Sequence, residues 1–149
     1  MRRRTLIGSL PLLAAGLGAG RGARAHSFPE DGFTVIHPWC EEAPRGTVDW
    51  LVQLRITDVS KADRLLAAST PVADGMSLRT PAYLQGIAQR DTGPGVPLQP
   101  GRDLVMNQLT QHFVLDRVNT DLRMGFEYPL SLIFERSGEV AAALIVGLD

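Results

Sequence analysis

Three histidines, His26, His37 and His112, are the residues of this chain whose chemistry is most specific. His26 follows a stretch with the anatomy of a cleavable leader, so cleavage after Ala25 makes it the first residue of the processed protein. Its free amino nitrogen and a ring nitrogen can then chelate one metal ion, and a second histidine completes a three-nitrogen set suited to Cu(II). The simpler alternative is that His26 only marks the cleavage junction.

The other two histidines lie in segments with strand character. His37 precedes Pro38 at a predicted strand end, which favours a structural role there. Residues 110–118, "TQHFVLDRV", alternate as a half-buried strand does, with His112 on the face opposite Phe113. His112 is therefore either a metal ligand or an ordinary hydrogen-bonded surface histidine.

Signatures of the common enzyme classes are absent from the sequence. It contains no Gly-x-Ser-x-Gly, no glycine-rich phosphate loop, no Cys-x-x-Cys and no His-Glu-x-x-His. Acidic residues are scattered, and no serine stands in a context that suggests a nucleophile with a base beside it. These absences favour a binding or transport protein over an enzyme.

The first 25 residues predict an export signal, and residues 26–149 a single processed domain. Residues 1–25 combine a basic start, an apolar stretch rich in Leu, Ala and Gly, and the small-x-small ending Ala23-Arg24-Ala25. The start Arg3-Arg4-Thr5-Leu6-Ile7 also resembles a twin-arginine signal. The apolar stretch is too short and too broken by glycine for a membrane span. We expect a periplasmic protein without membrane insertion after cleavage.

The net charge limits the classes of partner that the protein can bind, and the cysteine content limits how the fold can be stabilised. Without the leader, the chain keeps 10 basic and 16 acidic residues and no basic cluster. This balance argues against nucleic acid or an anionic membrane surface as a partner. Cys40 is the only cysteine, so an intramolecular disulfide cannot form, and a small buried residue is its simplest interpretation.

The remaining pattern predicts an all-β sandwich or barrel. In residues 49–56, Trp50, Val52, Leu54 and Ile56 fall on one face, as expected of a half-buried strand. Several short strands separated by turn signals indicate this fold class. Strands are predicted at 32–39, 49–56, 63–69, 75–80 and 110–118, a hairpin within 129–146, and a connecting loop at 93–103.

Three segments give a family resemblance. "KADRLLAASTPVADGMSL", "LQPGRDLVMNQLTQHFVL" and "GFEYPLSLIFERSGEV" resemble the periplasmic copper chaperones of the PCu(A)C type, in the same order and over residues 33–146. The resemblance implies a cupredoxin-like Greek-key β-sandwich that delivers Cu(I) toward cytochrome oxidase through two histidines and two methionines. It also implies a copper-receiving or copper-donating periplasmic partner.

The resemblance carries over only one of the four family ligands. The family's His-x-Met pair falls on His112 and Val114, the other histidine on Arg79, and the other methionine near Ala88. A guanidinium offers only donors and a permanent positive charge, so Arg79 cannot bind copper. The resemblance therefore implies a degenerate copper site.

Two hypotheses follow from this degenerate site. In the first, the chain is a copper chaperone, for Cu(I) or Cu(II), whose ligands have moved to His26, His37 and His112. In the second, it is a metal-free interaction module that uses the surface around Arg79 and His112. There the guanidinium would bind an anion or pair with Asp116 or Asp91.

Overall fold

The computed structural model describes residues 26–85 and 93–147. The predicted export signal, Ala88 and Asp91 lie outside these ranges. Within them, no helix is long and apolar enough to cross a membrane. The described elements are β1 (Ser27–Glu30), β2 (Phe33–Cys40), β3 (Val48–Thr57), β4 (Asp63–Ser69), β5 (Met76–Arg79), the 3-10 helix η1 (Ala82–Leu84), β6 (Val96–Leu98), β7 (Leu104–Met106), β8 (His112–Arg117), β9 (Glu127–Phe134) and β10 (Gly138–Val146).

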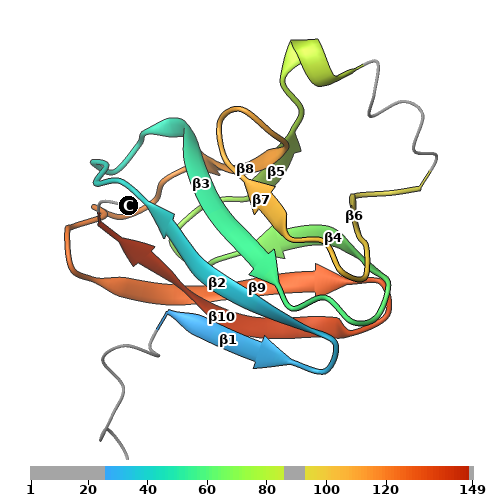
Figure 1. The fold of residues 1–149 in the computed structure, drawn as a ribbon. Coiled ribbons are helices and arrows are strands. Elements are labelled where there is room, and N and C mark those ends of the chain that lie inside the picture. Colours follow the sequence, from blue (N-terminus) through green and yellow to red (C-terminus); the bar gives the residue numbers. More distant parts are fainter. Residues whose placement is uncertain (1–25, 86–92, 148–149) are drawn as a thin grey trace, which may run out of the picture.

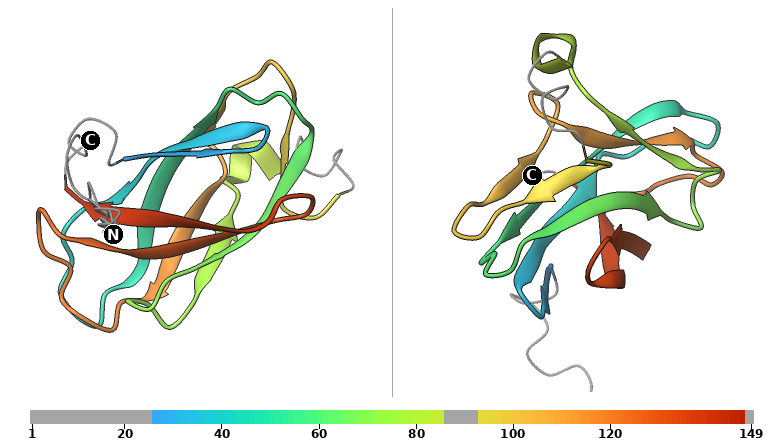
Figure 2. Two further views of the ribbon diagram at one scale, coloured as in Figure 1. Left: turned by 90° about the horizontal axis from the view of Figure 1, so that it is seen from below. Right: turned by 90° about the vertical axis from the view of Figure 1, so that its right-hand side faces the viewer.

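The strands form one strongly curled sheet (Figure 1). Their order is β5-β8-β3-β2-β10-β9-β4-β6, with β1 beside β2 and β7 beside β3. Two further views show the strands wrapped around a common interior (Figure 2). The predicted all-β sandwich or barrel is confirmed, and all the predicted strands are present.

The alternation predicted for β3 accounts for one wall of the core. Val52, Leu54 and Ile56 are buried, whereas Arg55 between them is exposed. Apolar side chains from the facing strands fill the space inside the curl, including Phe33 and Phe134, whose ring centroids lie 4.6 Å apart. Burial of these alternate apolar residues is the main force that holds the sheet in its curled shape.

Strand β2 changes its partner halfway along its length. Its first half, to Ile36, pairs antiparallel with β1, and its end, from Trp39, pairs parallel with β10. On its other side the register with β3 shifts between Ile36 and Trp39. His37 and Pro38 occupy this joint, and His37 has a left-handed backbone with φ of 46°. A bulge of this kind turns a side chain away from the regular face of the strand.

The predicted loop at 93–103 is only partly a loop. Val96–Leu98 form β6, which pairs antiparallel with β4 at the end of the sheet. Pro97 is tolerated because an edge strand need not donate every backbone N–H. The strand predicted from Thr110 begins instead at His112, because the Thr110 hydroxyl closes a turn onto the carbonyl of Val105, 2.8 Å away.

A buried carboxylate anchors the predicted hairpin of β9 and β10. Asp63, at the start of β4, accepts hydrogen bonds from the backbone N–H of Arg136 at 2.7 Å and from the Ser137 hydroxyl at 2.7 Å. Burial alone would raise the pKa of Asp63, but these hydrogen bonds outweigh it and hold the pKa below its ordinary value. The hairpin turn is therefore fixed to a strand more than 70 residues earlier.

Candidate metal centre

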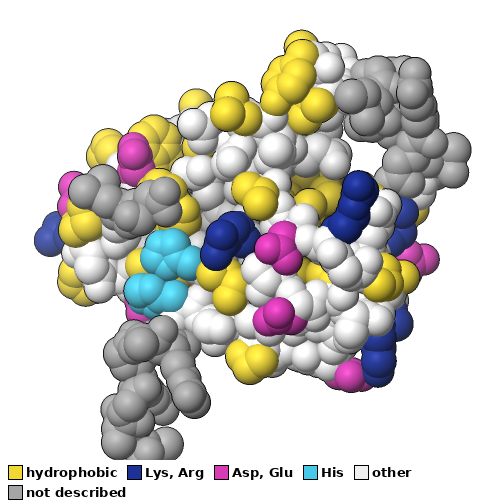
Figure 3. Space-filling model, in the orientation of Figure 1, with side chains coloured by type: hydrophobic (Ala, Val, Ile, Leu, Met, Phe, Trp, Pro, Cys, Tyr) yellow, Lys and Arg dark blue, Asp and Glu magenta, His cyan; other side chains and the backbone are white. Residues whose placement is uncertain are grey.

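His26 and His37 meet at the open end of the β1–β2 ladder. Ser27 pairs with Ile36, so His26 lies opposite His37, whose backbone N–H donates to the His26 carbonyl at 2.5 Å. The two Nδ1 atoms are 3.1 Å apart, and the ring centroids 4.8 Å. In the space-filling view the histidines form one patch on this face (Figure 3).

A carboxylate from a third strand completes the contacts of the His26 ring. Glu127, the first residue of β9, places Oε1 3.5 Å from His26 Nε2. Both side chains are about half exposed, at 41% and 46%. In metal sites, a ligating histidine commonly turns its second ring nitrogen toward a carboxylate, which fixes the tautomer and the ring orientation. Glu127 stands in that relation to His26.

The spacing of the two ring nitrogens suits shared ligation of one ion. Two nitrogens bound at about 2.0–2.1 Å, with an angle of about 90–110° between them, lie about 2.8–3.4 Å apart. The observed separation of 3.1 Å falls in this range. Across the described ranges, however, no group of three or more His, Cys, Asp or Glu side chains is arranged to hold a metal. A site here needs a further donor of another kind.

A hollow of about 350 Å³ opens beside His37. It lies over the joint in β2, where the register with β3 shifts, and extends toward β7. Trp39 forms part of its wall, and its ring centroid lies 6.3 Å from that of His37. Gln53, Arg55 and Asn107 contribute the polar lining. A basic side chain borders the histidine patch in Figure 3.

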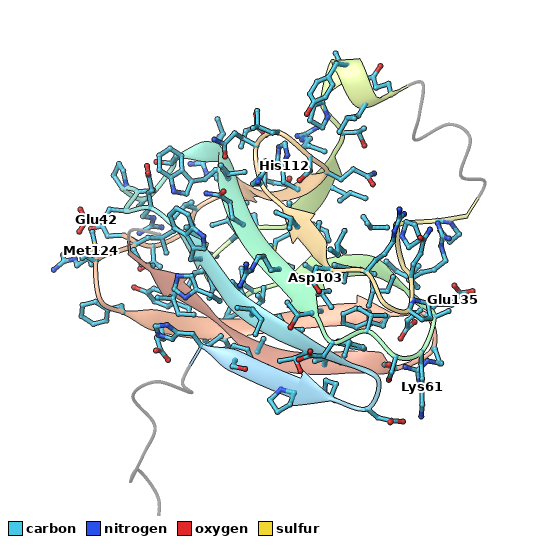
Figure 4. All side chains as sticks on the ribbon, viewed as in Figure 1. Glu42, Lys61, Asp103, His112, Met124 and Glu135 are labelled. Carbon is cyan, nitrogen blue, oxygen red and sulfur yellow. The ribbon has the colours of Figure 1, made fainter. Side chains whose placement is uncertain are left out.

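His112 lies apart from the histidine pair, at the start of β8 (Figure 4). Its Nδ1 is 2.9 Å from the Thr110 carbonyl. In the register of β5 and β8 it lies opposite Arg79. The structure therefore brings His26 and His37 together and leaves His112 in a different environment.

Arg79 pairs with an acid that the sequence did not suggest. Its Nη2 lies 3.0 Å from Asp49 Oδ1, so the side chain crosses β8 to reach β3. Asp116, one of the two expected partners, instead accepts a hydrogen bond from the Ser77 hydroxyl at 2.6 Å. The predicted pairing of Arg79 with Asp116 is therefore wrong, because the turned backbone at Asp49, φ 52°, presents a closer carboxylate. Asp91 lies outside the described residues.

The sulfur-containing residues near these strands belong to the core. Met106 is buried, and Met76 packs against the core cluster. Cys40 is also buried, as predicted, and burial raises the pKa of its thiol to about 12. None of these three sulfur atoms is placed to serve as a surface ligand.

Sequence reasoning missed Glu127 and the role of Arg55 in the hollow. Both depend on how distant strands align, and a single sequence does not specify that alignment. The Asp31–Gly32 turn was the available signal for the histidine pair, because a short turn between Glu30 and Phe33 sets the register that brings His26 opposite His37.

One protein-family model matches most of the chain. The model, described as LpqE-like, "Putative lipoprotein LpqE-like", covers residues 33–146. No curated protein sequence matches the chain.

Solved structures share the fold. The copper-bound PCuAC domain from PmoF2 is 18% identical, with a TM-score of 0.67 over 83% of this chain and 99% of that domain. The apo PCuAC domain from PmoF1 has the same identity and TM-score, over 83% and 100%. DR1885 from Deinococcus radiodurans, in its Cu(I) form, is 20% identical, with a TM-score of 0.58 over 87% and 85%. These likenesses confirm the predicted cupredoxin-like fold of PCuAC domains.

Proposed function

Because the chain belongs to the LpqE-like family, we propose that it is an exported, non-enzymatic copper-handling protein built on the PCuAC fold. Three observations support this role. The sequence begins with a stretch typical of an export signal, the family is described as one of lipoproteins, and two of the structural relatives are described as copper-bound. Copper is the cargo in this role.

We propose that copper binds at His26 and His37. The observation that carries this proposal is the 3.1 Å separation of their Nδ1 atoms. Cleavage after Ala25 supplies the missing donor, because the new amino terminus and Nδ1 of His26 chelate the same ion. Three nitrogens of this kind suit Cu(II). Glu127 holds the His26 ring with Nδ1 directed at His37.

The surface around His112 is the weaker candidate for copper. If Arg79 and Val114 stand where the family has ligands, that site has lost its soft thioether there and gained a positive charge. His112 is already engaged with the Thr110 carbonyl. The alternative of a metal-free module that binds anions there has less support, because Asp49 already neutralises Arg79.

In this role the protein exchanges copper with another periplasmic protein, either as donor or as receiver. The half-exposed ring of His26 suits a transfer of this kind, since a partner's ligands can reach an ion held near the surface. Cytochrome oxidase assembly is the pathway that the resemblance implies, and we propose it as the destination of the copper.

A competition titration tests the proposal. The protein is exported from its full-length precursor, its first residue is verified by intact mass, and it is titrated with Cu(II) and Cu(I) against chelators of known affinity. We expect stoichiometric Cu(II) binding that His26→Ala and His37→Ala abolish and that His112→Ala, the matched control, leaves unchanged. Loss of binding in His112→Ala alone would assign the copper to the other surface. Absence of binding in the unaltered protein would reject the copper role.

A further inference from the structure

The hollow beside His37 contains a guanidinium without an ionic partner. Arg55 lies in the middle of β3, opposite Ile36 on β2 and Val105 on β7. Arg79, by contrast, is paired with Asp49. Among the described residues, no carboxylate or carbonyl oxygen accepts a hydrogen bond from Arg55. Its charge and its five N–H donors therefore face the hollow and solvent.

The rest of the polar lining of the hollow also favours an anion. Gln53 and Asn107 line it with side-chain amides. Asn107 Oδ1 already accepts from the backbone N–H of Leu109 at 2.8 Å, which leaves the amide NH2 group to donate. Within the described chain, no acidic side chain lines this hollow. Among the side chains that line the hollow, hydrogen-bond donors therefore outnumber hydrogen-bond acceptors.

The size and lining of the hollow limit the size and chemical class of the ligand further. A volume of about 350 Å³ is at the small end of small-molecule sites. The indole of Trp39 and the side chain of Ile36 supply an apolar wall, and His37 lies at its border. A ligand that fits has one anionic group for Arg55 and a small apolar body.

We propose that this hollow is a carboxylate-binding subsite beside the copper ligands. Arg55 binds the carboxylate, because a planar guanidinium matches the two carboxylate oxygens with parallel hydrogen bonds. The ligand class is a small monocarboxylate, including amino acids, which themselves chelate Cu(II). The copper-linked part of this inference rests on the function proposed above, whereas the carboxylate site itself does not.

The subsite would let the proposed copper centre distinguish Cu(II) that carries a small carboxylate from Cu(II) alone. Cu(II) favours a tetragonal arrangement of nitrogen and oxygen donors. The amino terminus and two histidines supply three nitrogens, so a carboxylate oxygen can supply the fourth donor. The protein would thus bind Cu(II) together with a small carboxylate more tightly than Cu(II) alone.

The test has two arms on the exported protein. In the copper-free arm, sodium acetate is titrated against sodium chloride at matched ionic strength, while NMR follows the Trp39 indole N–H and the Arg55 Nε–H. In the copper arm, acetate and glycine are titrated into the Cu(II)-loaded protein, and electron paramagnetic resonance reports the ligand set. Arg55→Gln is compared with Arg117→Gln, which removes an equal charge from an exposed position on β8.

We expect saturable acetate binding in the unaltered protein and in Arg117→Gln, weakened about tenfold or more in Arg55→Gln, because a charge-assisted pair is lost. Equal binding in Arg55→Gln, or no saturable shift of either resonance, would overturn the subsite. If acetate binds as expected but Cu(II) does not, the subsite stands and the proposed copper role fails. If Cu(II) binds and the carboxylate response is missing from both arms, the copper role stands and the subsite fails.

Discussion

The Nδ1 atoms of His26 and His37 lie 3.1 Å apart because the β1–β2 hairpin folds the chain back on itself, although 11 positions separate the two residues. The turn at Asp31 and Gly32 fixes the hairpin register, and Gly32 adopts φ of 104°, which other residues rarely accept. A one-residue slip of this register would move one of the rings to the opposite face. The close approach of the two rings therefore depends on the turn as much as on the histidines themselves.

The proposed copper site depends on the first residue of the processed chain. A variant processed so that Ala25 remains as the first residue should bind Cu(II) about 100-fold or more weakly, because the amino nitrogen no longer belongs to His26 and the chelate is lost. The affinity is measured by chelator competition. Equal affinity of both forms would show that the amino terminus is not a ligand, and circular dichroism of the copper-free proteins controls for folding.

Glu127 should tune the copper affinity without binding the ion. Glu127→Gln removes the negative charge beside His26 Nε2, and outer-sphere partners of this kind typically contribute a factor of about 10–100 in metal affinity. Glu135→Gln, just beyond the far end of β9 (Figure 4), removes the same charge away from the site and should leave the affinity unchanged. Equal losses in both variants would indicate a general charge effect.

The surface around Arg79 tests the position of the family's copper site. The double change Arg79→His with Val114→Met should raise Cu(I) affinity sharply, because it replaces a cation with an imidazole and adds a thioether beside His112. Chelator competition under reducing conditions measures the gain. No gain would mean that the family's ligand positions lie elsewhere in this chain.

Arg79→Gln alone should cost less than about 1 kcal/mol of stability, because its pair with Asp49 is exposed.

Asp63 should make the fold sensitive to acid. The pKa of this carboxyl is lowered in the folded protein, so its contribution to stability is present above its unfolded pKa of about 3.9 and is lost as pH falls through the lower folded value. Asp63→Asn should cost about 1–3 kcal/mol at neutral pH, because it weakens several buried hydrogen bonds. Urea unfolding at pH 7 and pH 3 measures both effects. The variant should lose less stability between these pH values than the unaltered protein.

Local sequence signals predicted most of the strands for clear physical reasons. In β3 the alternation of Val52, Leu54 and Ile56 reflects burial on one face, and burial on one face follows from local periodicity. The Pro- and Gly-rich segment that contains β6 misled the prediction. This segment pairs with β4, a strand about 30 residues earlier in the chain, and a single sequence does not reveal that pairing. Pro97 is tolerated there because an edge strand need not donate every backbone N–H.

The site was less predictable because its contacts cross strands. The approach of Glu127 to His26 and of Arg79 to Asp49 depends on sheet order and register, which involve residues 30 to about 100 positions apart. The three histidines were visible in the sequence, but only the turn at Gly32 and the joint in β2 determine that two of them meet. The sequence identifies the candidate residues, and the sheet topology determines which of them come together.

The change of partner in β2 has a consequence for when the site can form. Trp39 and Cys40 pair with Ile145 and Val146, which lie in the last strand of the chain. During synthesis these residues emerge late, so a nascent chain can close the β1–β2 hairpin and pair Trp39 with Gln53 of β3 before the β10 side of the strand is paired. Glu127 likewise waits for the β9–β10 hairpin. Under the proposed function, the contacts around the two histidines are therefore complete only after β9 and β10 have been synthesised, which separates synthesis of the first strands from metal loading in time.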